Sequence, residues 1–273
     1  MSKKNKSSPP HKIFFATRPI GLPWDEASKN LTFQIAQNLE GYSFILLTYK
    51  DEANLTDRPW VIEKKIYSRA KFRHVSLRQK LSFILTLLFS NASLFHFYFT
   101  PELYSSFIFR IIRKFKKGKF LQTFATPTRE ETTFPKLVFG DAIVVQSDNS
   151  LKKAEDQGIQ NVIRIYPAVD TEAIKPGLDG VPLRRRLSIP PEHKVVLYGG
   201  NYYLGCNDDL IDAILSLSKK KTGITFILSC RINPEDLAER ERVERVLLSK
   251  KILNQVIFMD RVENMFQLIE ISD

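Results

Sequence analysis

The chain has little cysteine and no long apolar run. Its two cysteines are Cys206 and Cys230 among 273 residues, whereas disulfide frameworks belong to short secreted chains that are dense in cysteine. We therefore expect both thiols to be reduced. No apolar stretch approaches the roughly 20 residues that a bilayer-spanning helix needs, and the opening residues, MSKKNKSSPPHK, are too polar and basic for a signal peptide. These features predict a cytoplasmic protein that does not span a membrane.

Acidic residues are nearly missing from one segment. Residues 64–129 contain 14 Lys or Arg and one acid, Glu102, so this segment carries a charge of +13 and the rest of the chain −2. Nucleic acid would explain such a segment, but no recognised nucleic-acid-binding module is present and the aromatic residues cluster in apolar runs. We therefore expect no nucleic-acid partner and consider an anionic membrane surface instead.

The basic segment contains a strongly apolar helix, LSFILTLLF, at residues 81–89. One interpretation is a buried core helix whose preceding cations are solvated. The other is a helix that inserts into an anionic membrane surface, with the protein peripheral at the inner face of the membrane. In that case the stretch Lys64–Phe89 would supply the attraction, and the inserted face would consist of Phe83, Leu87 and Phe89. The sequence leaves both interpretations open.

Strand-like and helix-like segments alternate along the chain. In the first part the apolar runs expected to form strands are Lys12–Thr17, Ser43–Thr48, Trp60–Tyr67, Leu94–Phe99, Phe120–Phe124, Asp141–Gln146 and Val162–Tyr166. In the second part they are 195–200, 224–231 and the beginning of 256–264. Such alternation predicts an α/β protein with two Rossmann-like, doubly wound parallel sheets, in which ligands bind at the carboxyl ends of the strands.

Prolines and a basic run divide the chain near residue 170. We expect a disordered basic tail at 1–11, a first domain at 12–170, a linker at 171–190 and a second domain at 191–273. The first domain would close with a strand, a helix that Ser147 or Asp148 caps and Gly158 ends, and a last strand that Pro167 stops.

The turn after that last strand, Pro167-Ala168-Val169-Asp170, together with the glycine-containing strand end at 195–205, resembles the GT-B glycosyltransferases. The resemblance is to the large family 4 (group 1) of retaining enzymes that use nucleotide sugars. It implies an acceptor-binding first domain and a donor-binding second domain. It also implies that the nucleotide sugar is a substrate and that no cofactor and no metal ion are required.

The first strand opens into a glycine-containing loop, RPIGLPWDEASKN, before a helix. Unpaired amides at a helix N-terminus suit phosphate, but Gly21 could equally make an ordinary turn. In the resembled family this loop faces the interdomain cleft. The cleft residues implied by the resemblance are Gly21, Asp25, Glu26, Ser28 and Lys29, although Asp25 and Glu26 could simply be acids at a helix N-terminus.

His96 lies in the strand LFHFYF. It could be a core histidine, but it resembles the family's recurrent histidine where the acceptor is held. A second family histidine, at the end of the next strand, is replaced here by Ala125.

The loop after residue 198 carries the donor diphosphate in the resembled family. The amides of Gly199, Gly200 and Asn201 could hold phosphate, but Gly200 and Gly205 occupy the positions of two cations that the family uses. Arg231, at the end of a later strand, could replace this charge because its guanidinium pairs well with phosphate; the alternative is an ordinary exposed arginine. Family contacts to the nucleobase would fall on Arg261 and Val262.

The family's Glu-x7-Glu motif has no match in the 273 residues. A further strand should begin at 271–273, so we expect this chain to be a fragment with an incomplete second domain, which could be inactive alone. The sequence thus predicts a glycosyltransferase that acts on a polysaccharide or lipid-linked acceptor, with catalytic residues unassigned. The alternatives are a non-catalytic GT-B relative and a basic membrane-surface-binding protein without transfer chemistry.

Overall fold

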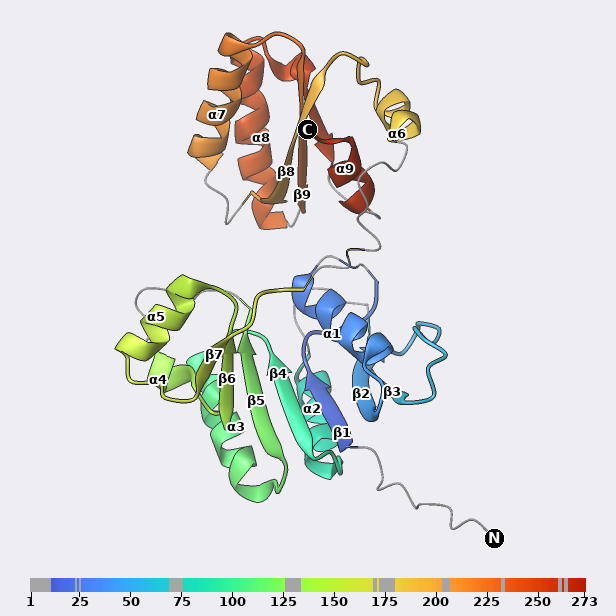
Figure 1. Cartoon of the computed structure of the whole chain (residues 1–273), viewed down its shortest axis with the longest axis vertical. Coiled ribbons are helices and arrows are strands. Elements are labelled where there is room, and N and C mark those ends of the chain that lie inside the picture. Colours follow the sequence, from blue (N-terminus) through green and yellow to red (C-terminus); the bar gives the residue numbers. More distant parts are fainter. Residues whose placement is uncertain are drawn as a thin grey trace. The chain divides into compact units, whose positions relative to one another are not determined.

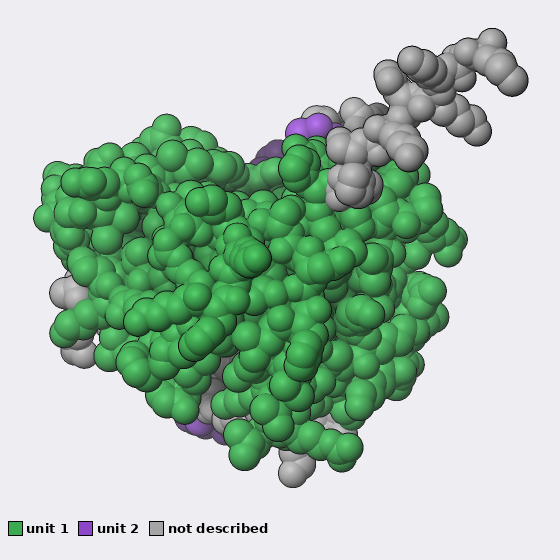
Figure 2. All heavy atoms as spheres, turned by 90° about the horizontal axis from the view of Figure 1, so that it is seen from below, with its two compact units in different colours: residues 1–168 green, residues 169–273 purple. Residues whose placement is uncertain are grey.

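A computed structural model describes residues 11–22, 24, 26–68, 76–125, 134–168, 171, 180–202, 207–231, 234–259, 262 and 265–273. For residues 201, 207, 231 and 234–236 it describes the backbone only. The chain forms two compact units, Met1–Ala168 and Val169–Asp273, which Figure 2 colours separately. Each unit is described by itself below.

The first unit is built on a parallel sheet (Figure 1). Its strands, in spatial order, are β3 (Val61–Tyr67), β2 (Tyr42–Tyr49), β1 (His11–Ala16), β4 (Leu94–Tyr98), β5 (Lys119–Phe124), β6 (Ala142–Val145) and β7 (Val162–Arg164). The order runs one way from β1 to β3 and the other way from β4 to β7. The reversal creates a topological switch point between β1 and β4, and in sheets of this kind ligands bind outside the carboxyl ends of the strands at that point.

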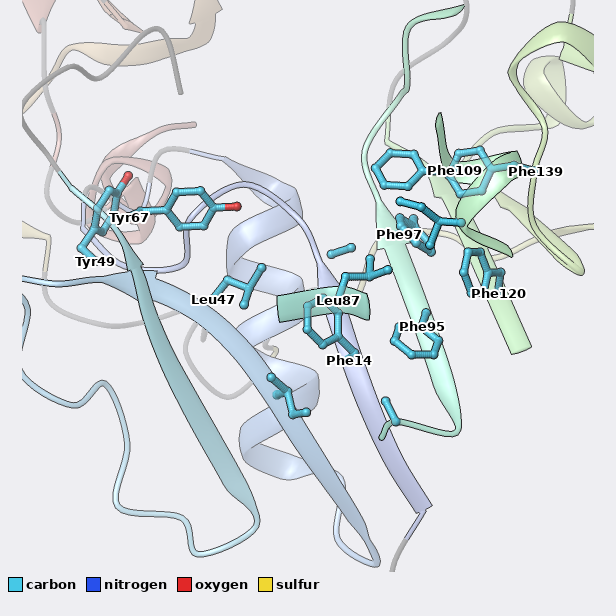
Figure 3. Packing of buried hydrophobic residues seen from close by; sticks show 14 residues of the cluster. Phe14, Leu47, Tyr49, Tyr67, Leu87, Phe95, Phe97, Phe109, Phe120 and Phe139 are labelled. Atoms are coloured by element: carbon cyan, nitrogen blue, oxygen red, sulfur yellow. The ribbon is translucent and has the colours of Figure 1, made fainter. Parts of the chain in front are cut away.

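Helices cover both faces of this sheet. They are α1 (Ala27–Asn38), α2 (Leu77–Phe89), α3 (Leu103–Phe115), the short α4 (Phe134–Leu137) and α5 (Asp148–Asp156). Because successive strand residues point to opposite faces, Phe14 packs in a cluster with residues of α2 and α3, while Phe15 packs in a cluster with residues of α1. The first cluster is rich in phenylalanine, and Figure 3 shows its rings in contact across β4, β5 and α3.

Helix α2 corrects one prediction. Leu87 is fully buried, and the ring of Phe83 packs edge-on against Phe109 at 6.2 Å between centroids. Both therefore belong to the core and cannot insert into a membrane, whereas Phe89, the third residue of the expected face, is exposed. The core interpretation is right for one side of the helix, and the exposed residues lie on the opposite side.

The second unit has a smaller parallel sheet in the order β10 (Val256–Met259), β9 (Ile224–Arg231), β8 (Lys194–Asn201). One face packs against α7 (Asn207–Lys220) and α8 (Pro234–Ser249), and the other against α6 (Val181–Arg186) and α9 (Met265–Ile271) (Figure 1). A 3-10 turn at Leu253–Gln255 precedes β10. Two parallel sheets with flanking helices confirm the predicted fold class.

Residues 181–190 differ from the linker that the sequence predicts. They include α6, whose Leu183 packs with Ile189 and Ile271 in the core of the second unit. The guanidinium of Arg184 donates hydrogen bonds to the carbonyls of His193 and Ile271 at 3.0 and 2.8 Å. This end of the expected linker is therefore an integral part of the second unit.

Candidate functional site

The carboxyl ends of β1 and β4 place the expected acceptor residues in one region of the first unit. The two strands pair with Phe15 opposite His96 and Ala16 opposite Phe97. After β1 the chain returns to the neighbouring strand, where the Ile20 amide donates to the Leu47 carbonyl at 2.9 Å. The loop that carries Gly21 is therefore anchored to the carboxyl end of β2, on the side of β1 away from β4, before α1 begins.

Gly21 is required by a close approach rather than by a phosphate. Its φ is +136°, and a Cβ there would overlap the carboxylate of Glu52. Glu52 Oε1 accepts a hydrogen bond from the amide of Leu22 at 3.1 Å. Since a carboxylate already uses this amide, the geometry favours the turn interpretation over phosphate binding for this loop.

Glu26, Ser28 and Lys29 lie at the beginning of α1. Glu26 is the N-cap residue, but its side chain caps nothing and instead pairs with Arg18 at 2.5 Å. Ser28 is a buried residue within the helix. Lys29 is only 4% exposed, and its Nζ lies 3.4 Å from the carbonyl of Gly21. Asp25 lies outside the described residues.

Three threonines that the sequence analysis missed lie on the elements next to this loop: Thr17 directly follows β1, Thr32 is in α1 and Thr48 is in β2. The hydroxyls of Thr17, Thr32 and Thr48 are buried and have no hydrogen-bond partner among the described residues. Burying a hydroxyl without a partner is costly, and a polar ligand could offset that cost. A detectable signal was the spacing of Ser28 and Thr32, which puts two hydroxyls on one side of α1.

His96 is a partly buried histidine held by a neighbouring strand. Its Nε2 lies 2.8 Å from Thr123 Oγ1, and its ring stacks on Tyr98 with centroids 5.7 Å apart. Burial lowers the pKa of His96 to about 4. The imidazole is therefore neutral at neutral pH, where it can exchange hydrogen bonds but adds no positive charge.

Tyr98 and Gln146 extend this polar group. Gln146 Nε2 donates to Tyr98 Oη at 2.5 Å, and burial raises the pKa of Tyr98. Tyr98 ends β4 and Gln146 directly follows β6. The alternation of polar positions in His96-Phe97-Tyr98 was a signal for Tyr98 alone. Ala125 directly follows β5, so no imidazole is present at that strand end.

In the second unit the expected donor residues gather at the carboxyl edge of the sheet. Gly199 and Gly200 belong to β8 and pair with Ser229 and Cys230, and Asn201 pairs in register with Arg231. The backbone of Arg231 therefore lies next to the strand end that was expected to hold phosphate. Arg231 is the last residue of β9, as the sequence predicts.

The glycines of β8 lie in a strand rather than in a loop. In a parallel ladder, alternate amides of β8 point to β9 and the others point away, so only part of the amides of Gly199, Gly200 and Asn201 could reach a phosphate. Val262 packs at the edge of the α6–α9 cluster. Arg261 and Gly205 lie outside the described residues.

Two features of the described part of the chain bear on cofactors and membranes. In it, no group of three or more His, Cys, Asp or Glu side chains could hold a metal ion. No helix among the described residues is long and apolar enough to cross a bilayer.

Known proteins resemble this chain in structure rather than in sequence. No family model and no curated protein matches it. Sucrose-phosphate synthase from Thermosynechococcus elongatus superposes with a TM-score of 0.69 at 16% identity over 96% of this chain and 74% of that protein. Anabaena HepE, solved with UDP and glucose, superposes with a TM-score of 0.67 at 15% identity, over 96% of this chain and 72% of HepE. A glycosyltransferase from Rickettsia africae superposes with a TM-score of 0.67 at 16% identity, over 96% of this chain and 71% of that protein.

These similarities show the fold. The structural neighbours are GT-B glycosyltransferases, and this chain has the same fold over almost its whole length. The predicted GT-B resemblance is confirmed at that level. Membership of family 4 stays a prediction, since the identities are low.

Proposed function

We propose that this protein transfers a sugar from a nucleotide-sugar donor to an acceptor hydroxyl. The observation that carries the proposal is the carboxyl edge of the second sheet, where the ends of β8 and β9 pair at Asn201 and Arg231. Strand amides and a guanidinium together suit a diphosphate. HepE, which shares the fold, was solved with UDP and glucose, and this supports a nucleoside diphosphate as the ligand.

In this proposal each unit has a separate task. The diphosphate is stabilised as it leaves by those amides of Gly199, Gly200 and Asn201 that point away from β9 and by the side chain of Arg231. A well-placed donor of this kind contributes about 3–4 kcal/mol to the transition state. By the family resemblance, the nucleobase would contact Arg261 and Val262.

The first unit would hold the acceptor. His96 and Tyr98 can exchange hydrogen bonds with sugar hydroxyls, and Lys29 brings a cation close to the Gly21 loop. The buried hydroxyls of Thr17 and Thr48, which have no partner among the described residues, would offer further hydrogen bonds to a polar ligand. A neutral His96 fits a hydroxyl acceptor better than an anionic one, because it adds no charge.

Further parts of the proposal rest on the sequence. Transfer with retention of the sugar configuration follows from the family resemblance of the Pro167–Asp170 turn. We include no metal ion, because a cation at Arg231 can compensate the charge of the leaving group. An acceptor at a membrane surface, either lipid-linked or a polysaccharide, would explain the basic segment 64–129.

The test is to titrate the protein with UDP, ADP and GDP in a calorimeter and then to measure nucleoside-diphosphate release from the corresponding nucleotide sugars, with and without lipid extract. Acceptor-dependent release supports the proposal. Binding without release from any donor indicates the non-catalytic alternative. Absence of binding to all three nucleotides contradicts a donor site and leaves the surface-binding alternative.

A further inference from the structure

The outer side of α2 carries a row of exposed apolar residues. They recur every fourth residue, which places them on one side of a helix: Leu77, Leu81, Leu85 and Phe89. Phe89 is 84% exposed. The row lies opposite Leu87, whose side chain faces the core. The helix is therefore apolar on two sides, and packing explains only one of them.

Helix α3 has a second row of the same kind. Its members are Tyr104, Phe107, Ile111 and Phe115, and they lie opposite the buried Phe109 and Ile112. Phe107 and Phe115 are 59% and 76% exposed. An aromatic side chain exposed to this extent leaves apolar area in water that the fold could have covered.

The two rows belong to neighbouring helices on the same side of the sheet. Phe83 of α2 contacts Phe109 of α3, and both helices pack in one cluster. At their C-terminal ends, Lys116 Nζ donates to the carbonyls of Leu88 and Ser90 at 3.0 and 2.6 Å. This contact brings the ends that carry Phe89 and Phe115 together. We call the eight residues of the two rows the α2–α3 apolar face.

Positive charge dominates around this face, although Glu102, the N-cap residue of α3, is exposed beside it and Arg113 pairs with Asp141. Helices α2 and α3 contain no Asp or Glu. Their exposed cations are Arg78 and Lys80 on α2, Arg110, Arg113 and Lys114 on α3, and Lys117 and Lys119 just after α3. Apolar side chains interspersed with cations are typical of a helix surface that lies in the interface of an anionic bilayer.

We propose that the α2–α3 apolar face binds the surface of an anionic lipid bilayer. A second copy of the chain is a poorer occupant, since it would bring two cationic surfaces together. An anionic bilayer instead offers headgroups to the cations and hydrocarbon to Phe89, Phe107 and Phe115. The inference deepens the membrane part of the proposed function, but it requires no sugar transfer.

Two contributions to binding can be separated by salt. Attraction of the cations to the headgroups falls as salt screens charge over about 10 Å at 0.1 M. Insertion of the exposed phenylalanines is not screened. We therefore expect binding that weakens with salt but leaves a salt-resistant remainder.

The experiment is co-sedimentation of the protein with vesicles of phosphatidylglycerol and phosphatidylcholine, compared with vesicles of phosphatidylcholine alone. The double variant Phe107→Gln, Phe115→Gln should bind the anionic vesicles ~10-fold or more weakly, because two large apolar groups no longer insert. The matched control is Leu237→Gln, Leu248→Gln on α8, which changes two exposed apolar residues elsewhere and should bind like the unaltered protein. Circular dichroism checks that both variants remain folded.

A charge variant completes the test. Arg78→Gln, Lys80→Gln, Lys114→Gln should remove most binding at low salt. The proposal is overturned if the unaltered protein does not sediment with anionic vesicles at low salt, or if both test variants bind unchanged. It is also overturned if ultracentrifugation shows a dimer that Phe107→Gln, Phe115→Gln dissociates. No nucleotide is present in these assays, so failure here leaves the donor proposal intact, and failure of nucleotide binding leaves this one intact.

Discussion

His96 shows how the sheet sets the chemistry of a single side chain. It lies on β4 beside Phe15 and Tyr98, whose rings exclude water, and its Nε2 contacts Thr123 Oγ1. Burial lowers its pKa from 6.5 to about 4. An unfolded chain therefore binds a proton at His96 between pH 6.5 and pH 4, whereas the folded chain does not.

This difference predicts a loss of stability on acidification. Because the unfolded state binds more protons in that window, the free energy of unfolding falls as the pH is lowered from 6.5 to 4, by up to about 3 kcal/mol from this residue. His96→Gln should remove that part of the pH dependence. Urea unfolding of the variant and the unaltered protein at pH 7 and pH 4.5 measures it, with His11→Gln as the control. Identical pH dependence in His96→Gln and the unaltered protein would show that His96 is not held neutral.

The proposed donor site can be tested at one residue, Arg231. Its backbone pairs in register with Asn201 at the end of β8. We expect Arg231→Ala to weaken nucleoside-diphosphate binding by about 1.5–3 kcal/mol, which is the value of a charge-assisted hydrogen bond.

Calorimetric titration measures this change. The matched control is Arg245→Ala, which removes an exposed arginine of α8 that pairs with Glu241, and its affinity should stay that of the unaltered protein. Unchanged affinity in Arg231→Ala would move the phosphate site away from β9 and direct attention to Lys29.

At the scale of elements, the loop after β1 depends on one glycine. Gly21 has a φ of +136° and lies against the Glu52 carboxylate that accepts the Leu22 amide. Gly41 also has a positive φ, +84°, but nothing lies within 4 Å of the position of a Cβ. Substitutions at the two glycines can therefore separate the cost of backbone strain from the cost of losing the Glu52 contact.

We expect Gly41→Ala to cost about 1 kcal/mol for the strained backbone alone. Gly21→Ala should cost more, about 2–4 kcal/mol, because the methyl group also displaces Glu52 from the Leu22 amide. Urea unfolding gives both values. Equal destabilisation by the two substitutions would mean that the Glu52 contact does not stabilise the loop.

Most of the elements could be predicted from the sequence, because apolar runs and their glycine and proline boundaries are local signals. As expected, Ser147 caps the beginning of α5, where its side chain accepts from the Ser150 amide. Gly158, with φ +79°, follows the end of the same helix, also as expected. Helix α6 could not be predicted in the same way. Its VPLRRR sequence is short and basic, and its stability depends on packing against Ile271, far along the chain.

The faces of helices were harder to predict than their bounds. Helix α2 is apolar almost all round, so periodicity alone could not tell that Leu87 faces the core and Phe89 faces solvent. The exposed row of α3 was missed for a related reason, because its phenylalanines occur on both faces. In the candidate site, Tyr98 and Thr123 were missed because their roles depend on which strands are neighbours.

At the scale of the whole molecule, the chain contains two units with separate cores. Clusters around Phe14, Phe15 and Phe124 belong to the first unit, and clusters around Phe226 and Ile227 belong to the second. This division lets donor and acceptor sites be tested one at a time. The order of strands about β1 and β4, which creates the switch point where we propose that the acceptor binds, follows from tertiary pairing and was not readable from any local pattern.

The central claim is that the second unit binds a nucleoside diphosphate at the carboxyl edge of β8 and β9. Hydrogen exchange measured by mass spectrometry, with and without UDP, ADP or GDP, locates the site in the intact protein. We expect the nucleotide that binds to slow exchange most in peptides that cover 195–202 and 224–231. Slowing confined to peptides of the first unit, or no change with any of the three nucleotides, would contradict the account.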